Sequence, residues 1–407
     1  MFKIRRFVKI SNNYSNIKAL IVLWPVYLVV FCVFFDTHAQ MPILAPYTMS
    51  LGATPFTLGL VVGTYSLFNI IGNFIGGGAI DYKGWKYPLL FGLVGVSIAL
   101  ILYTLAGQAD HLVAVRAAHG FTGGLMIPAA LACLTVREKS GYTRDLRLAF
   151  FGATIGLASV SGPPAAGLIA NQYGFHMVYY SLAGLMVVSA MLAFGLLKKW
   201  PTRPQCGNSP YRVTFKQITA TPAIRGAFIF ALGTTGSTGT LASFLPGRAE
   251  SAGLDHGQTG MLFASFALAA IIIQLSWPGV IKKRIKESTF GCIAGLLLLI
   301  PALIMAGSFN SVAGLFIALV IYGCGFGLSF QGMLSMLLEN SDRSWQGRAI
   351  GFFFAAYSLG IALLPPLGGL IWQLFPTVLP FYTAAAIVVL SLFTGLKTCR
   401  QISAFNL

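Results

Sequence analysis

The chain has 407 residues, of which 56% are hydrophobic and only 9% are charged, with a mean hydropathy of +0.78. Soluble domains carry about a quarter charged residues, so this composition excludes an ordinary soluble protein and predicts an integral membrane protein. The net charge of +17 would suit a nucleic-acid-binding protein, but the basic residues lie in short segments between apolar runs, so we expect no nucleic-acid partner.

Apolar runs of about 20 residues, the length that spans a bilayer, recur along the whole chain. They predict twelve spans at 19–45, 56–80, 88–108, 111–135, 147–170, 176–197, 223–247, 258–281, 288–307, 312–336, 348–372 and 379–396. The expected fold class is therefore an all-α integral membrane protein with twelve transmembrane helices in two pseudo-symmetric six-helix halves. The halves are predicted at 1–197 and 223–407, joined by a central cytoplasmic loop at 198–222.

The two halves resemble each other in sequence. Gly59 matches Gly260 at an offset of 201, and the proline pair that begins at Pro163 matches the pair at Pro365 at an offset of 202. Two homologous six-helix halves are the parallel-repeat plan of one class of transporters, whose substrate site lies between the halves near the middle of the membrane.

The basic residues predict the orientation in the membrane. With twelve spans, all Lys and Arg except Arg116 and Arg248 fall on one side. Basic loops mark the cytoplasm, so both termini are predicted there, in a multi-pass protein of the cell membrane, taken as a bacterial inner membrane. The N-terminal apolar run is full length, which predicts an uncleaved first helix rather than a removed signal peptide.

The chain offers no recognisable chemistry of an enzyme. The six cysteines are scattered without disulfide or metal spacing. We recognise no nucleophile–base set, phosphate-binding loop or metal cluster in the sequence. We therefore expect neither an enzyme nor an ATP-driven pump, with no catalytic residue, metal or cofactor.

The first two spans carry polar residues. Asp36 lies inside span 1, where a carboxylate is costly and is by default a functional-site hypothesis. Span 2 contains Tyr65, Asn69 and Asn73, and the two asparagines share one helical face at i, i+4. That face could line a substrate cavity, or the asparagines could make hydrogen bonds to a neighbouring helix.

The loop after span 2 carries a motif. The sequence from Gly77 to Lys86 resembles a signature of the major facilitator superfamily, G-x-x-x-D-(R/K)-x-G-(R/K)-(R/K). Gly77, Asp81, Gly84 and Lys86 match it, whereas two of its three basic positions hold Tyr82 and Trp85. The resemblance implies a gating role, in which Asp81 helps to hold the two halves together on the cytoplasmic side.

Span 4 resembles the second signature of the superfamily, L-x-x-x-R-x-x-Q-G, through Arg116 and with His119 in place of Gln. A buried Arg stays charged and needs a partner. Asp36 and Arg116 are expected at nearly the same depth, so an ion pair between them is geometrically allowed. Asp36, Arg116 and His119 are the predicted proton-coupling residues, because a carboxylate and an imidazole can both titrate.

Span 5 resembles the third signature, G-x-x-x-G-P-x-x-G-G, through Gly162, Pro163 and Gly167. In the superfamily this motif is typical of exporters that work by proton antiport. The twelve-span plan covers the whole chain, so the resemblance implies a drug/proton antiporter-like member of the superfamily.

The predicted function is proton-coupled efflux, by alternating access, of a small organic solute such as a drug, a secreted metabolite or a siderophore. Candidate substrate-cavity residues are Tyr65, Asn69 and Asn73 together with Gln274 and Gln331 in spans 8 and 10. The expected partners are the substrate, protons and the lipid bilayer, and we expect a monomer. Proton-coupled uptake and a sensor or scaffold without transport remain the alternatives.

Overall fold

The computed structural model describes residues 23–135, 141–196, 214–277, 281, 288–342, 345–375 and 378–400. Among these residues, eleven helices are long and apolar enough to cross a membrane. A bent pair, α2 (Trp24–Ala39) and α3 (Leu44–Ser50), meets at 50° and makes a twelfth span. The prediction of an all-α membrane protein with twelve spans is confirmed.

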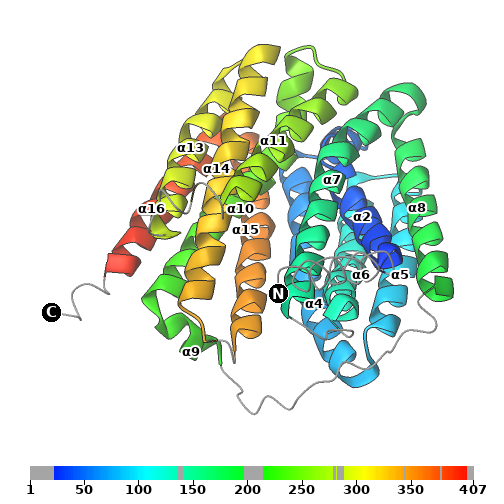
Figure 1. Cartoon of the computed structure of the whole chain (residues 1–407). Helices are drawn as coiled ribbons and strands as arrows, with labels where there is room; N and C mark the ends of the chain where they lie inside the picture. Colours follow the sequence, from blue (N-terminus) through cyan, green and yellow to red (C-terminus); the bar gives the residue numbers. More distant parts are fainter. Residues whose placement is uncertain are drawn as a thin grey trace, which may run out of the picture.

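The remaining helices follow in the predicted order (Figure 1). They are α4 (Pro55–Lys83), α5 (Lys86–Thr104), α6 (Ala109–Thr135), α7 (Gly141–Tyr173), α8 (Phe175–Leu196), α9 (Phe215–Ala220), α10 (Pro222–Ser251), α11 (His256–Ser276), α13 (Ser288–Ser308), α14 (Val312–Glu339), α15 (Gln346–Leu374) and α16 (Leu379–Arg400).

Two segments differ from the expected boundaries. The first span runs to Ser50 rather than to residue 45, because the chain bends at 40–43 and resumes a helix in α3. Pro42 lies in that bend, where its missing N–H interrupts the helical hydrogen bonds. The stretch predicted as a loop at 198–222 contains the short helix α9, which Thr214 and Gln217 start with a capping box. Residues 197–213 lie outside the described chain.

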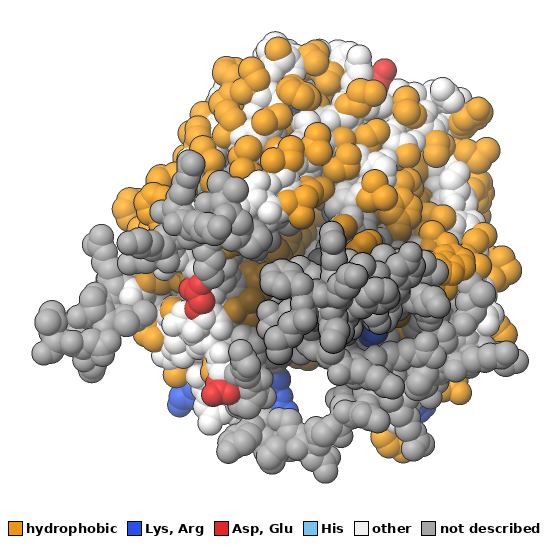
Figure 2. Space-filling model, in the orientation of Figure 1, with side chains coloured by type: hydrophobic (Ala, Val, Ile, Leu, Met, Phe, Trp, Pro, Cys, Tyr) orange, Lys and Arg blue, Asp and Glu red, His pale blue; other side chains and the backbone are white. Residues whose placement is uncertain are grey.

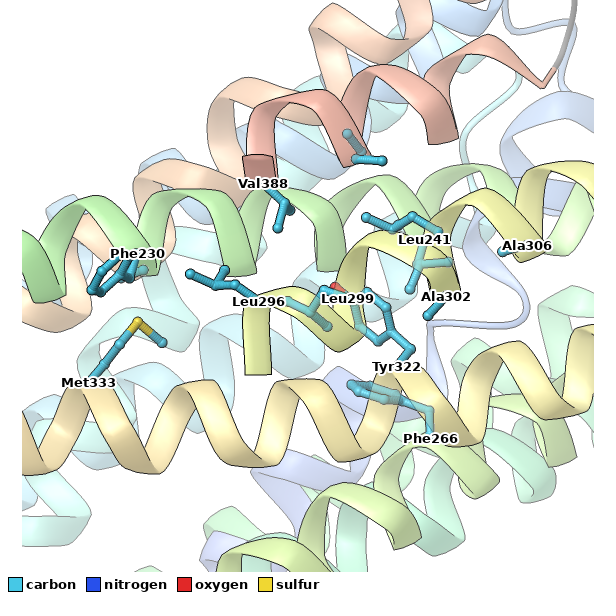
Figure 3. Packing of buried hydrophobic residues seen from close by; sticks show 14 of the residues in the cluster. Phe230, Leu241, Phe266, Leu296, Leu299, Ala302, Ala306, Tyr322, Met333 and Val388 are labelled. Atoms are coloured by element: carbon cyan, nitrogen blue, oxygen red, sulfur yellow. The ribbon is translucent and has the colours of Figure 1, made fainter. Parts of the chain in front are cut away.

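The buried apolar side chains form two clusters. One is built from helices α2 to α8, which we call the first group. The other is built almost entirely from helices α9 to α16, the second group. Figure 1 shows the two groups side by side, the first in blue to green and the second in green to red. Figure 3 shows part of the second cluster, where Phe230, Leu296 and Leu299 pack between helices.

Helices α7 and α11 form one seam between the groups. A Cβ added at Gly167 would overlap the backbone of His256, and one added at Gly260 would overlap the carbonyl of Pro163. Glycine is therefore required at both positions for the two backbones to touch. These contacts lie where α7 ends and α11 begins, an end of the molecule that we call the closed end.

Helices α4 and α15 form a second seam with the same design. A Cβ at Gly59 would overlap the carbonyl of Pro365, and a Cβ at Gly369 would overlap the backbone of Pro55. Each contact repeats one of the first seam with residues 201 or 202 positions apart. The repeat seen in the sequence therefore reappears as a reciprocal pair of contacts at the closed end.

The outer surface suits a bilayer. Large exposed apolar side chains include Phe74, Phe91 and Leu275, each more than half exposed. Figure 2 shows hydrophobic side chains over most of the flank, with Lys and Arg gathered towards the lower end of that view. Lipid-facing surfaces carry such apolar residues, because polar groups there would lose their hydration.

Candidate functional site

A buried polar site surrounds Asp36 on α2. Asp36 is only 1% exposed. Its Oδ1 accepts a hydrogen bond from Nε2 of Gln40 at 2.8 Å. Its Oδ2 lies 3.0 Å from Nε2 of His119 on α6. Both carboxylate oxygens are therefore held by side chains, away from solvent.

Arg116 on α6 lies in the same site. Its Nε donates to the carbonyl of Val61 on α4 at 3.0 Å, and its Nη1 donates to Oε1 of Gln40 at 3.1 Å. The same Nη1 donates to the hydroxyl of Tyr103 on α5 at 3.3 Å. The guanidinium also stacks on the ring of Tyr65, 4.4 Å from the ring centre. The buried cation thus donates to acceptors on α4, on α5 and in the bend at 40–43 that follows α2.

A last contact closes the site into a ring. The hydroxyl of Tyr103 lies 3.3 Å from Nδ1 of His119. Following the hydrogen bonds gives a closed circuit of Asp36, Gln40, Arg116, Tyr103 and His119, which we call the Asp36 ring. All five residues are buried.

The structure brings the three predicted proton-coupling residues together, but not as an Asp–Arg pair. Among the described residues, the salt bridge of Asp36 is to His119, and Arg116 reaches Asp36 through the amide of Gln40. Sequence reasoning missed Gln40 and Tyr103. Gln40 lies four residues after Asp36, a spacing that places both on one helical face, so its signal was available. Tyr103 carries no comparable signal.

Glycines bring the helices of the site together. A Cβ at Gly120 would overlap the backbone of Tyr65, and one at Gly124 would overlap that of Asn69. This close approach of α4 and α6 places Arg116 within reach of the Val61 carbonyl. The small residues of the second signature region therefore serve to position the guanidinium.

The second group holds an uncharged version of the same site. Gly323 approaches Phe266 as Gly120 approaches Tyr65, which fixes the equivalence of the two groups. On that equivalence, the places of Asp36, Gln40, Arg116, Tyr103 and His119 are taken by Ser237, Leu241, Leu319, Ala306 and Tyr322. The hydroxyl of Tyr322 lies 2.7 Å from Oγ of Ser237, and Figure 3 shows Tyr322, Leu241 and Ala306 among packed apolar side chains. The same fold thus packs without a charged ring.

The predicted cavity residues lie on different helices, with the two asparagines on α4 and the two glutamines in the second group. Nδ2 of Asn73 donates to Oδ1 of Asn69 at 2.8 Å, and Nδ2 of Asn69 donates to the carbonyl of Gly120 at 3.4 Å. The interhelical hydrogen bond that the sequence left open is therefore present. Gln274 on α11 and Gln331 on α14 are half-buried.

The gating motif lies at the end opposite the closed end. Gly84 ends α4 with a φ of 81°, a conformation that favours glycine, and its N–H bonds to the carbonyl of Ile80 at 2.8 Å. Lys86 begins α5, and its Nζ lies 5.6 Å from the ring centre of Phe194. Gly77 lies within α4 with open space around it. The side chain of Asp81 lies outside the described structure.

The motif on α7 links the site to the first seam. A Cβ at Gly162 would lie 3.0 Å from the carbonyl oxygen of Phe35 and 3.1 Å from the nitrogen of Ala39. These two residues flank Asp36 on α2. Pro163 and Gly167 then touch α11 across the seam, so one helix contacts both the part of α2 that carries Asp36 and the second group.

Comparisons with known proteins agree on one family. The model of the Major Facilitator Superfamily matches residues 26–347 and 226–399. The chain is 27% identical over 343 residues to the multidrug resistance protein MdtG of Serratia proteamaculans, covering 81% of each. It is 24% identical over 373 residues to MdtG of Escherichia coli O9:H4, covering 89% of this chain and 90% of the relative.

Solved structures share the fold. A bacterial homologue of the human lysosomal transporter Spinster, in an inward-facing and unoccupied conformation, superposes with a TM-score of 0.79 at 15% identity. The match covers 93% of this chain and 98% of that one. The nucleoside transporter NupG gives a TM-score of 0.73 at 14% identity and covers 93% of this chain and 98% of that one.

Proposed function

The chain belongs to the major facilitator superfamily, a family of transporters rather than enzymes, and from that premise we propose that it exports a small organic solute in exchange for protons. Asp36 and His119 would bind and release the proton, and Arg116 would balance the charge of the Asp36 carboxylate. Transport would proceed by alternating access, in which the two groups rock about a central site.

The observation that carries this proposal is the contrast between the two groups. A buried charged network costs desolvation, and replacing one by apolar residues of similar volume is often neutral or stabilising. The second group has a version without charge, with Leu319 in the place of Arg116 and Ser237 in the place of Asp36. Packing alone therefore does not require the Asp36 ring, which points to a role in transport.

Proton coupling needs a group whose protonation changes the balance between conformations. The carboxylate of Asp36 and the imidazole of His119 touch at 3.0 Å inside a span, so one added proton changes the net charge of the whole ring. Helix α7 packs against α2 on both sides of Asp36 and also forms the first seam. A change at the ring can therefore act on the contact between the groups.

We propose that the two groups are the functional halves, 1–197 and 223–407, with 198–222 between them on the cytoplasmic side. The separate hydrophobic clusters and the reciprocal seams support this division. The basic loops support a cytoplasmic position for both termini, which places the closed end outside. The state described here would then open to the cytoplasm, where an exporter takes up its substrate.

Two observations favour export over uptake. The relatives MdtG are named multidrug resistance proteins. Pro163 and Gly167 of the α7 motif, which is typical of antiporters, lie in the first seam. The substrate class is a small organic solute such as a drug, secreted metabolite or siderophore, taken from the side that the closed end leaves accessible.

The test uses purified protein in proteoliposomes with an imposed proton gradient. We expect substrate-induced proton flux in the wild type and its loss in Asp36→Asn, while substrate binding, measured by thermal shift against a panel of drugs and siderophores, persists. Unchanged proton-coupled transport in Asp36→Asn would rule out Asp36 as the coupling site. Substrate accumulation in right-side-out vesicles under an inward proton gradient would show uptake by symport and overturn export.

A further inference from the structure

The directions of the hydrogen bonds in the Asp36 ring follow from the groups that can only donate. A guanidinium has five donors and no acceptor, so Oε1 of Gln40 must accept from Arg116. This fixes the amide, and its Nε2 must donate to Oδ1 of Asp36. The first branch of the ring therefore runs from Arg116 to Asp36 with one defined polarity.

The second branch obeys the same logic. Nη1 of Arg116 donates to the oxygen of Tyr103, whose single proton is then free to point at Nδ1 of His119. With Nδ1 accepting, His119 carries its proton on Nε2 and donates it to Oδ2 of Asp36. In this arrangement every polar atom of the second branch has a partner.

The opposite tautomer leaves a buried group without a partner. A proton on Nδ1 would make the Tyr103 oxygen accept twice, and its own O–H would then need another acceptor. Tyr103 is 0% exposed, and its hydroxyl has two partners among the described residues, Arg116 and His119. A buried hydroxyl without an acceptor is costly. Charge favours the same state, since Arg116 and an ionised Asp36 balance when His119 is neutral.

We propose that Tyr103 is a positioning residue for the proton: its hydroxyl holds His119 in the neutral Nε2–H tautomer and blocks Nδ1 until it turns away. This inference rests on the proposed proton-coupled export. When the hydroxyl turns, an incoming proton binds Nδ1, the Nε2–H bond breaks and its proton binds Oδ2 of Asp36. His119 is again neutral, now protonated on Nδ1, and Asp36 is a carboxylic acid, so one proton has been taken up.

Tyr179 provides a matched control. Its ring stacks on that of Tyr103 with centres 4.5 Å apart and planes within 3°, and it is equally buried. Its hydroxyl has no hydrogen-bond partner among the described residues. Tyr179→Phe therefore removes a hydroxyl from the same stack without changing the ring of hydrogen bonds, whereas Tyr103→Phe removes the group that occupies Nδ1.

The first measurement is the ¹⁵N spectrum of histidine-labelled full-length protein in lipid, with the His119 signals assigned by their loss in His119→Gln. At neutral pH we expect a wild-type His119 with Nε2 protonated and Nδ1 bare. In Tyr103→Phe, the hydroxyl that occupies Nδ1 is missing. We therefore expect the signal of neutral His119 protonated on Nδ1 to appear at a pH higher than in the wild type by about half to one unit, the equivalent of one hydrogen bond. A wild-type His119 protonated on Nδ1 at neutral pH overturns the proposal without any variant.

The second measurement is the pH profile of transport in proteoliposomes. We expect its midpoint to move to higher pH by the same amount in Tyr103→Phe and to stay in place in Tyr179→Phe. An unmoved midpoint in Tyr103→Phe, or an equal shift in both variants, overturns the role of Tyr103. The tautomer is measured without substrate or gradient, so a failure of proton-coupled export, seen as wild-type transport independent of pH, is distinguished from a failure of this inference.

Discussion

The first seam offers a direct test of how the two groups move against each other. Gly260 on α11 touches the Pro163 carbonyl so closely that a Cβ has no room there. Because the obstructing atom belongs to the backbone, α7 and α11 must separate to admit Gly260→Ala. We therefore expect this substitution to disfavour the state in which the closed end is shut.

The size of the effect follows from the cost of overpacking. Forcing extra carbon into a close-packed contact costs about 1–3 kcal/mol, which is a shift of roughly 5- to 150-fold in the balance between two conformations. Alanine is also the better helix former, by up to about 1 kcal/mol over glycine. Gly184→Ala on α8 isolates that gain, because Gly184 is exposed with open space around it.

The assay is a distance measurement by double electron–electron resonance. Spin labels at Gly107 and Val312, both exposed where α6 and α14 begin at the closed end, report the separation of the two groups in a background without native cysteines. We expect a longer, separate distance to gain population in Gly260→Ala. Gly59→Ala, at the equivalent place in the second seam, should give a shift of the same sign.

Two results would refute this reasoning. If Gly260→Ala and Gly184→Ala give the same distance distribution as the parent, the seam does not set the closed state. If both shift equally, the change comes from helix propensity and not from the contact with Pro163.

Further predictions concern the two ends of the molecule. Oδ1 of Asn171 accepts from the backbone N–H of His256 across the first seam at 3.1 Å. Asn171→Ala should therefore shift the balance towards the state in which the closed end has opened, by about 1 kcal/mol in the same distance assay. Gln373→Ala should cause no such shift, because Gln373 is the equivalent of Asn171 and Pro55, the equivalent of His256, has no N–H. Hydrogen bonds from the backbone of Gln258 and the side chain of Asn171 hold the pKa of Asp255 below its ordinary value. The stabilisation by Asp255 is therefore present above about pH 4 and lost as pH falls through the lowered pKa, and a small loss of thermal stability in acid should be absent from Asp255→Asn. Gly84→Ala should lower the melting temperature by the equivalent of about 1–2 kcal/mol because of its positive φ, whereas Gly77→Ala, in open helical space, should not.

The sequence was enough to predict the fold because hydropathy alone decides which segments can cross a bilayer. The span count was correct, and the break in the first span had a visible cause in Pro42. Span ends were predicted less well: the described part of α7 extends to Gly141, beyond the apolar run that predicted it, since a helix can continue into water where hydropathy no longer marks it.

The site was predictable only in part. Asp36, Arg116 and His119 stood out because charged or titratable side chains are rare within spans. Their connection through Gln40 and Tyr103 depends on side-chain directions and on the bend at 40–43, which no spacing rule supplies. The sequence allowed an Asp–Arg pair on the ground of depth alone, and depth does not reveal an amide that lies between two charges.

In the proposed proton coupling, the position of Asp36 would let one protonation site act on an assembly of two similar groups. The second group has Ser237 and Tyr322 at the equivalent place, and neither titrates near neutral pH, so protonation makes the groups differ in charge. Only one helix, α7, lies between α2 at Asp36 and the seam with the other group. Gly162 of α7 rests on α2 on both sides of Asp36, and the next residue, Pro163, touches Gly260 across the seam. A small shift of α2 on the proposed protonation would therefore meet a backbone contact with no spare space. Close-packed contacts of this kind transmit displacement rather than absorb it.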